Sequence, residues 1–115
     1  MSTIQEEKQA VAREILRQLQ VLKVSRMGFS FLPLTGAEHF SYTEDSLTFK
    51  IKHKNKRKIN TIKISLNWKN LYDVEFWNSR LLKKAPYVVN EKIDTAEDVY
   101  ADMLPDLLAG KVELA

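Results

Sequence analysis

The fold is decided by the stretch IKISLNWKNLYDVEF, residues 62–76, in which apolar side chains recur at every second position on either side of a polar connection. The recurring side chains are Ile62, Ile64 and Leu66 before the connection, residues 67–71, and Tyr72, Val74 and Phe76 after it. Because successive side chains of a β-strand point to opposite faces, each run predicts a strand with one apolar face. Matching the two faces predicts an antiparallel hairpin with Ile64 opposite Val74 and Ile62 opposite Phe76.

The same alternation continues upstream and extends the hairpin into a meander. Two further runs alternate in this way: Leu47, Phe49 and Ile51, and before them Phe40 and Tyr42. Their apolar faces predict Phe49 opposite Ile64, and Phe40 opposite Phe49 across a turn at residues 43–46. On the outer face this register predicts three rows of neighbours: Lys50, Lys63 and Glu75; Thr48, Ser65 and Asp73; Lys52, Thr61 and Trp77. Downstream, Tyr87, Val88 and Val89 after Pro86 indicate a further strand.

Helical spacing marks both ends of the chain. Residues 3–24 carry an amphipathic stripe, and Thr3 with Glu6 has the form of a capping box. The stripe consists of Ile4, Val11, Ile15, Leu19 and Leu22. A second helix is predicted to begin near Thr95, capped with Asp98, to be kinked or divided at Pro105 and to end near Gly110. Its buried side would consist of Val99, Tyr100, Met103, Leu104 and Leu107.

Between the first helix and the meander, Gly28 and Pro33 interrupt any periodicity. Phe29, Phe31, Leu32 and Leu34 indicate a short edge segment that leads into a turn at residues 35–36.

These elements predict one α+β domain over residues 1–115, in which a four- to five-stranded antiparallel meander carries a long N-terminal helix and a shorter C-terminal helix on one face. The 115 residues are 44% apolar, enough for a single core. No apolar run approaches the roughly 18 residues of a membrane span, and the polar N-terminus differs from a signal peptide. We therefore expect a cytoplasmic protein without a membrane partner.

Charge is distributed unevenly along the chain, although the net charge is only +3. Residues 46–72 contain no acidic side chain and eight basic ones, whereas residues 91–115 contain seven acidic side chains and two basic ones. Such asymmetry indicates what the surface attracts rather than how the chain folds.

The densest basic segment is the predicted hairpin tip at residues 53–58. The candidate nucleic-acid-binding residues are Lys50, Lys52, Lys54, Lys56, Arg57 and Lys58, with Trp77 as a surface on which an unpaired base can stack. Two alternatives stay open: the tip binds an acidic protein, or it is a solvated loop that protects a sheet edge from aggregation. Lys63, Asp73 and Glu75 are explained by ion pairing on a solvated sheet face.

The sequence offers little for catalysis or metal binding. It has no cysteine, and neither His39 nor His53 has an acidic residue at a metal-ligand spacing. The three glycines are not clustered, which excludes a phosphate-cradling loop, and no nucleophile motif occurs. Asp73 and Glu75 share one strand face, as in some metal nucleases, but no Glu-x-Lys strand follows them. We expect neither an enzyme nor a cofactor.

Three segments resemble a group of small proteins from bacteriophages and integrated mobile elements. The segments are KINTIKISLN at residues 58–67, LYDVEF at residues 71–76 and VYADML at residues 99–104, and the turn Thr35-Gly36-Ala37 is similar as well. The resemblance covers about residues 31–108 and departs from the group at residues 104–107. It implies a viral or mobile-element origin and a helix-flanked antiparallel sheet, and it implies no activity.

The sequence thus favours a small non-catalytic, phage-like protein that contacts nucleic acid through its basic hairpin without sequence specificity. The alternative is an effector that binds and inhibits a host protein or defence complex. It would use either the hairpin or the acidic residues Asp98, Asp102 and Asp106 as a mimic of phosphate charge. Either would act in the host cytoplasm, and the long first helix offers a surface for a homodimer.

Overall fold

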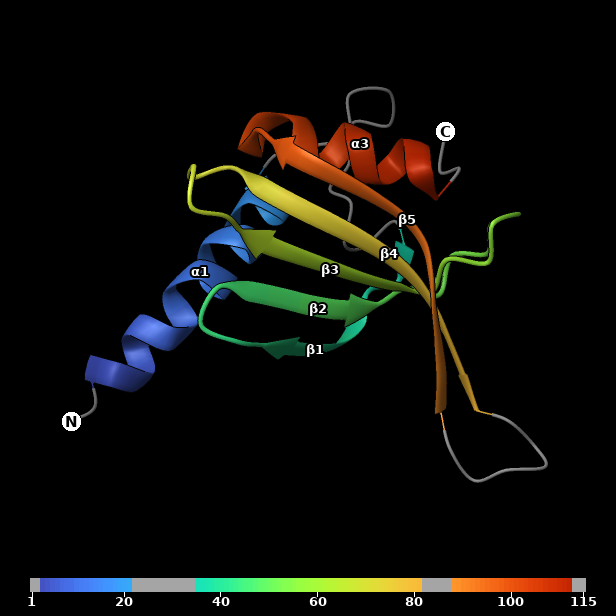
Figure 1. The fold of residues 1–115 in the computed structure, drawn as a ribbon, viewed down its shortest axis with the longest axis horizontal. Helices are drawn as coiled ribbons and strands as arrows, with labels where there is room; N and C mark the ends of the chain where they lie inside the picture. The colour runs from blue at the N-terminus through green and yellow to red at the C-terminus, as the bar shows by residue number, and fades with distance from the viewer. Residues whose placement is uncertain (1–2, 22–34, 82–87, 113–115) are drawn as a thin grey trace.

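The computed structural model describes residues 3–21, 35–81 and 88–112, and it contains one antiparallel sheet flanked by helices (Figure 1). In chain order the elements are α1 (Thr3–Val21), β1 (Glu38–Tyr42), β2 (Ser46–Lys50), β3 (Thr61–Leu66), β4 (Tyr72–Leu81), β5 (Val88–Val99), a 3-10 turn (Ala101–Met103) and α3 (Leu104–Lys111). The five strands lie side by side in sequence order. The predicted α+β fold with an antiparallel meander is confirmed.

The β3–β4 hairpin has the predicted register. Ile64 lies opposite Val74 and Ile62 opposite Phe76. The connection also occupies the predicted residues 67–71, since the Asn67 N–H donates to the Leu71 carbonyl at 2.8 Å. Asn70 adopts a left-handed conformation with φ 63° in this turn, a conformation in which Asn is favoured over most other residues.

The predicted β2–β3 register is wrong by two residues. Phe49 lies opposite Ile62 rather than Ile64, and Leu47 lies opposite Ile64. A shift of two residues keeps every side chain on its face, so alternation alone does not distinguish the two registers. The outer rows are therefore Ser46, Ser65 and Asp73; Thr48, Lys63 and Glu75; and Lys50, Thr61 and Trp77.

The edge strand β1 follows the prediction in part. The Phe40 and Phe49 rings lie 5.6 Å apart, as their expected pairing implies. The predicted turn is also present, with the Thr43 N–H donating to the Ser46 carbonyl at 3.0 Å. The register shifts between Glu38 and Ser41, and Phe40 stays partly exposed because it lies at the edge of the sheet.

The core lies on one face of the sheet, where both helices contribute to it. Fully buried side chains of α1 and α3 form one cluster with the inward side chains of β2, β3 and β4. From the helices these are Ile15, Leu19, Leu104 and Leu108, and from the strands Leu47, Phe49, Ile62, Ile64, Val74 and Phe76. Two of the five predicted stripe positions, Ile15 and Leu19, are thus confirmed as core, and Val11 packs against it.

The region after Asp94 differs most from the prediction. Residues 95–99 continue β5, which runs from Val88 to Val99 along β4, and the helix begins only at Leu104. Pro105 lies in the first turn of α3, where the missing N–H of proline costs no hydrogen bond, and therefore it does not kink the helix. Tyr100 and Met103, predicted as buried, are exposed.

Pairing with a distant strand explains why β5 replaces the predicted helix turn. The Thr95 hydroxyl donates to the Val74 carbonyl at 3.1 Å, and the Asp98 N–H donates to Asp73 Oδ1 at 3.1 Å. Thr95 and Asp98 therefore hold β5 to β4 instead of capping a helix.

Several predicted features lie outside the described residues. These are the Thr3–Glu6 cap, the side chains of Ile4 and Leu22, and the segment from Phe29 to Leu34. The predicted turn at residues 35–36 is present, with Gly36 at φ 66°. Among the helices that the structure describes, none combines the length and apolar character needed to cross a membrane.

We expect Ile64→Ala to lower the free energy of unfolding by about 2 to 5 kcal/mol, because it opens a cavity between the sheet and the helices. Urea denaturation followed by circular dichroism measures the change. Glu97→Ala, at an exposed position of β5, is the control and is expected to shift stability by less than about 0.5 kcal/mol. Equal effects of the two substitutions would contradict the assignment of the core.

Candidate functional site

The basic loop, residues 51–60, connects β2 to β3 and is closed by its own side chains. Both polar atoms of the Asn55 amide bond to the Ile59 backbone: Oδ1 accepts from its N–H and Nδ2 donates to its carbonyl, each at 2.8 Å. The Lys58 N–H donates to the Asn55 carbonyl at 3.1 Å, and Lys58 adopts a left-handed conformation with φ 61°. A tight turn therefore presents Lys56 and Arg57 at the tip.

The base of the loop is bonded to the sheet. The Ile51 N–H donates to the Asn60 carbonyl, and the Asn60 N–H donates to the Trp77 carbonyl, both at 3.0 Å. The Asn60 amide exchanges two 2.8 Å hydrogen bonds with the Ser79 backbone. Asn78 Nδ2 donates to the Lys58 carbonyl at 2.6 Å. These bonds fix where the loop leaves the sheet.

A third segment supports the beginning of the loop. The N–H groups of Lys52 and His53 donate to the Thr35 carbonyl at 2.8 and 3.0 Å. Gly36 follows with a positive φ, and a Cβ at this position would lie 3.1 Å from Lys52 Cβ. A side chain at residue 36 would therefore crowd Lys52, so glycine suits both the turn and the close approach.

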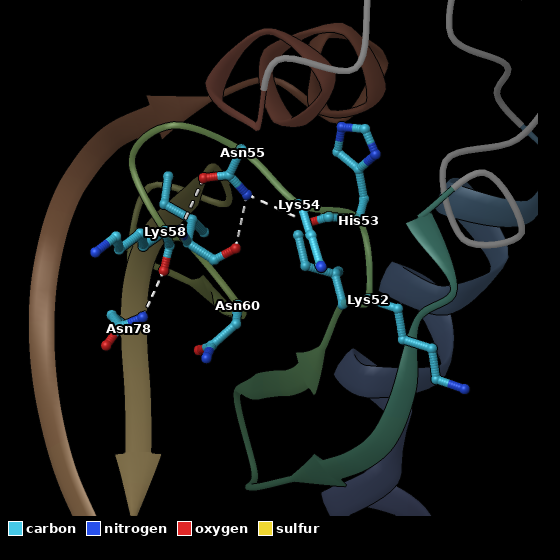
Figure 2. A pocket seen from close by; sticks show the side chains of 9 residues that line it. Lys52, His53, Lys54, Asn55, Lys58, Asn60 and Asn78 are labelled. Atoms are coloured by element: carbon cyan, nitrogen blue, oxygen red, sulfur yellow. Dashed lines mark hydrogen bonds between the residues drawn. The ribbon is translucent and has the colours of Figure 1, made fainter.

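A cavity of about 330 Å³ lies along the loop (Figure 2). Its lining combines three lysines, a histidine, three asparagines and two isoleucines: Lys52, Lys54, Lys58, His53, Asn55, Asn60, Asn78, Ile51 and Ile59. In Figure 2 the side chains of Lys52 and Lys58 point in opposite directions, and Lys54 lies between them. The ammonium groups are thus distributed along the loop rather than converging on one point.

Carboxylates pair with part of the predicted basic patch, contrary to the expectation of a loop without acidic neighbours. Arg57 lies 2.9 Å from Asp94 Oδ2, and Lys52 lies 3.6 Å from Glu38. Within the described part of the chain, Lys50, Lys54 and Lys58 have no ion pair. The acidic C-terminal segment therefore neutralises Arg57 and leaves these three lysines as available cations.

Asp94 links the loop to the C-terminal helix. Its carboxylate accepts a 2.7 Å hydrogen bond from Lys111 of α3 and also faces Arg57. The Lys111 hydrogen bond, the Thr95 N–H and Arg57 together lower the pKa of Asp94 from 3.8 to about 2. The carboxylate is therefore charged at neutral pH and connects Arg57 to Lys111.

Trp77 lies on the outer face of β4, with Thr61 and Lys92 as its strand neighbours. The predicted neighbour Lys52 is not in this row because of the register correction, and Lys50 takes its place. The indole N–H donates to Glu75 Oε1 at 3.1 Å, and the Lys92 ammonium lies 5.3 Å from the ring centroid. Lys92 also pairs with Glu75 at 3.6 Å.

Five residues that organise this region were not predicted. Asn55, Asn60 and Asn78 hold the loop, Lys92 packs on Trp77, and Asp94 binds Arg57. The only sequence signal was Asn55 inside a hairpin tip, because asparagine favours turns. The others depend on which strands become neighbours.

The described residues contain no group of three or more His, Asp or Glu side chains that could hold a metal ion. Comparison of the chain with family models, curated proteins and solved structures found no match.

We expect Asp94→Asn to lower the free energy of unfolding at pH 7 by up to about 1 kcal/mol, because a partly exposed ion pair contributes little more. Since the native pKa is lowered to about 2, the contribution is complete above the unfolded pKa, near 4. It is lost as pH falls through the native pKa. Urea unfolding at pH 7, 4 and 2 measures the difference from the unmodified protein.

Glu97→Gln is the matched control, because Glu97 is an exposed carboxylate of β5 without an ion pair in the described chain. Its difference from the unmodified protein should be small at every pH. A stability difference for Asp94→Asn that persists unchanged at pH 2 would show that the Asp94 charge is not its cause.

Proposed function

We propose that the protein is a non-catalytic nucleic-acid-binding protein whose basic loop contacts the phosphate backbone. The observation that carries this proposal is the set of lysines Lys50, Lys54 and Lys58. They lie at or beside a hydrogen-bonded loop and have no ion pair within the described residues. Such cations displace the counterions condensed on a polyanion, which favours binding.

The distribution of charge favours an extended polyanion over a small anion. A single phosphate is held by donors that converge on it, whereas Lys52 and Lys58 point in opposite directions (Figure 2). Lysine is a flexible point charge without the fork geometry that reads a base edge. The contacts we propose are therefore electrostatic and independent of sequence.

The resemblance of three segments to small bacteriophage and mobile-element proteins supports an origin in such an element. A binding protein of this origin would act in the host cytoplasm. Its hydrogen-bonded loop suits a protein that acts by occupying a surface.

We expect the double substitution Lys54→Gln and Lys58→Asn to weaken duplex binding and to reduce its salt dependence. Asparagine at residue 58 preserves the left-handed backbone there. Two lost phosphate contacts should reduce the slope of log K against log salt by about 1.8 on duplex DNA. Fluorescence anisotropy with a labelled duplex, at salt concentrations from about 25 to about 200 mM, measures the slope.

The matched control removes two positive charges elsewhere, with Arg13→Gln and Arg17→Gln on the exposed side of α1. It is expected to leave the slope within about 0.5 of the unmodified protein. Absence of binding to either DNA or RNA at low salt would refute the proposed function, and equal slopes for the two double variants would refute the role of the loop.

A second candidate function is supported by three exposed apolar side chains that follow the far ends of β3 and β5. Trp68 is 88% exposed, Tyr100 60% and Met103 56%. The first lies in the β3–β4 turn, where Asn67 and Lys69 both bond to Asp98 near the end of β5. Exposed Trp and Tyr are typical of protein-binding hot spots. Exposed Glu97 and Asp102 nearby favour a host protein with a basic surface.

For this second function we expect Trp68→Ser to abolish capture of one stoichiometric partner from nuclease-treated host lysate. The Lys54→Gln and Lys58→Asn variant serves as the control and should capture that partner normally. Quantitative mass spectrometry of the captured proteins measures the difference. A partner captured equally by Trp68→Ser would show that these side chains are not the interface.

A further inference from the structure

A groove of about 260 Å³ lies on the outer face of the sheet, away from the helices. It is lined by one aromatic, one cationic and four hydrogen-bonding side chains: Trp77, Lys63, Glu75, Asn90, Thr48 and Thr61. We propose that this outer groove holds one unpaired base of a single-stranded nucleic acid. The inference rests on the proposed function, and it adds that the bound nucleic acid is single-stranded.

Hydrogen bonding and ion pairing hold the Trp77 indole, the aromatic side chain of the outer groove, in place without a ligand. The Trp77 indole N–H donates to Glu75, whose carboxylate also pairs with Lys92, and the Lys92 ammonium lies over the indole ring. Lys92 does not line the groove, whereas Thr48, Thr61 and Lys63 do. The ring therefore borders an open space toward β2 and β3, and a planar base can enter this space and stack.

Lys63 supplies a cation that the sheet itself does not use. It lies directly opposite Glu75, the partner predicted by charge pairing. Glu75 instead contacts Trp77 and Lys92, and Lys63 has no ion pair among the described residues. The ammonium of this half-buried residue lines the groove together with the indole and suits a phosphate or a base carbonyl of a bound nucleotide.

The remaining lining groups suit a base better than a phosphate. Glu75 repels a phosphate, whereas its carboxylate accepts hydrogen bonds from the exocyclic amines of bases. The Asn90 amide both donates and accepts, as does the Thr48 hydroxyl, whereas the Thr61 hydroxyl donates to Asn60 Oδ1 at 3.0 Å and remains an acceptor. Because a base in a duplex is stacked and paired, only a splayed base of a single strand can reach these groups.

The outer groove lies near the base of the basic loop. Lys50, at the end of β2, lies in the same row as Thr61 and Trp77. The Trp77 carbonyl accepts a hydrogen bond from Asn60, the last residue of the loop. One strand of nucleic acid can therefore place a base in the groove while a neighbouring phosphate contacts Lys50 on the same sheet face.

The test uses the full chain with Trp68→Phe, which leaves Trp77 as the sole tryptophan. The probes are oligo(dT), mixed-sequence single-stranded DNA and a hairpin duplex of equal nucleotide number, at one salt concentration. We expect both single strands to quench Trp77 fluorescence and to bind more tightly than the duplex. In anisotropy measurements with labelled strands, Trp77→Val should weaken single-strand binding by about tenfold, the effect of one lost stacking contact.

The same variant should leave duplex affinity and its salt slope unchanged, because the loop is intact. Lys63→Gln is the second variant, in case Trp77→Val does not fold as judged by circular dichroism. It should weaken single-strand binding and leave duplex binding unchanged. Trp77→Phe, which keeps an aromatic ring, should retain most of the single-strand affinity.

The outcomes separate this inference from the proposed function. Equal binding of single strands and duplex, with no quenching and no effect of Trp77→Val or Lys63→Gln, would overturn the groove inference and leave the role of the loop intact. Absence of binding to every probe at low salt would overturn the proposed function and, with it, this inference.

Discussion

Alternate side chains of β3 and β4 are fully buried against the two helices, and this division between the faces determines where every polar group of the sheet lies. Ile62, Ile64, Val74 and Phe76 fill the inner face. Burial of each such side chain stabilises the fold by about 1.5 to 3 kcal/mol. A register shift of one residue would move all the apolar side chains of a strand from the core face to the solvent face. Lys63, Glu75 and Trp77 are therefore confined to the outer face.

The same burial fixes the two ends of the basic loop. Ile51 and Ile59 are both buried in the core cluster, although neither belongs to a strand. Between them the chain has no apolar side chain, and five of residues 52–58 are exposed, whereas His53 and Asn55 are partly buried. The hydrogen bonds of Asn55, Asn60 and Asn78 restrain the backbone of the loop. The backbone of the loop is therefore held in place, and the flexible lysine side chains extend from it.

Local pattern was sufficient for the fold class and for the β3–β4 register, because the connection is short and both strands alternate clearly. The local pattern was insufficient to predict the register of β2 against β3, because the longer loop between these strands permits registers that differ by two residues. It failed at residues 95–99, because the pairing of β5 with β4 overrides a capping pattern of Thr95 and Asp98. The basic residues of the candidate site were visible in the sequence, but the pairing of Arg57 with Asp94 depends on this long-range strand contact.

The separation of charge along the sequence has a structural consequence. Within residues 46–72 a basic side chain finds no acidic neighbour, so its ion pairs must reach distant segments. Arg57 and Lys69 reach Asp94 and Asp98 of β5, one near each end of β3. No ion pair of the described chain involves Lys50, Lys54, Lys58 or Lys63, although Lys50 lies opposite Glu38 in the sheet. Lys50 and Lys63 lie on the outer face with Trp77, and the other two lie on the basic loop, where Lys58 is bonded to Asn78 of β4. Two of these four cations therefore lie on the same sheet face as the partly exposed indole. In the proposed function, a single-stranded polyanion would meet these two cations on the same surface on which its bases stack.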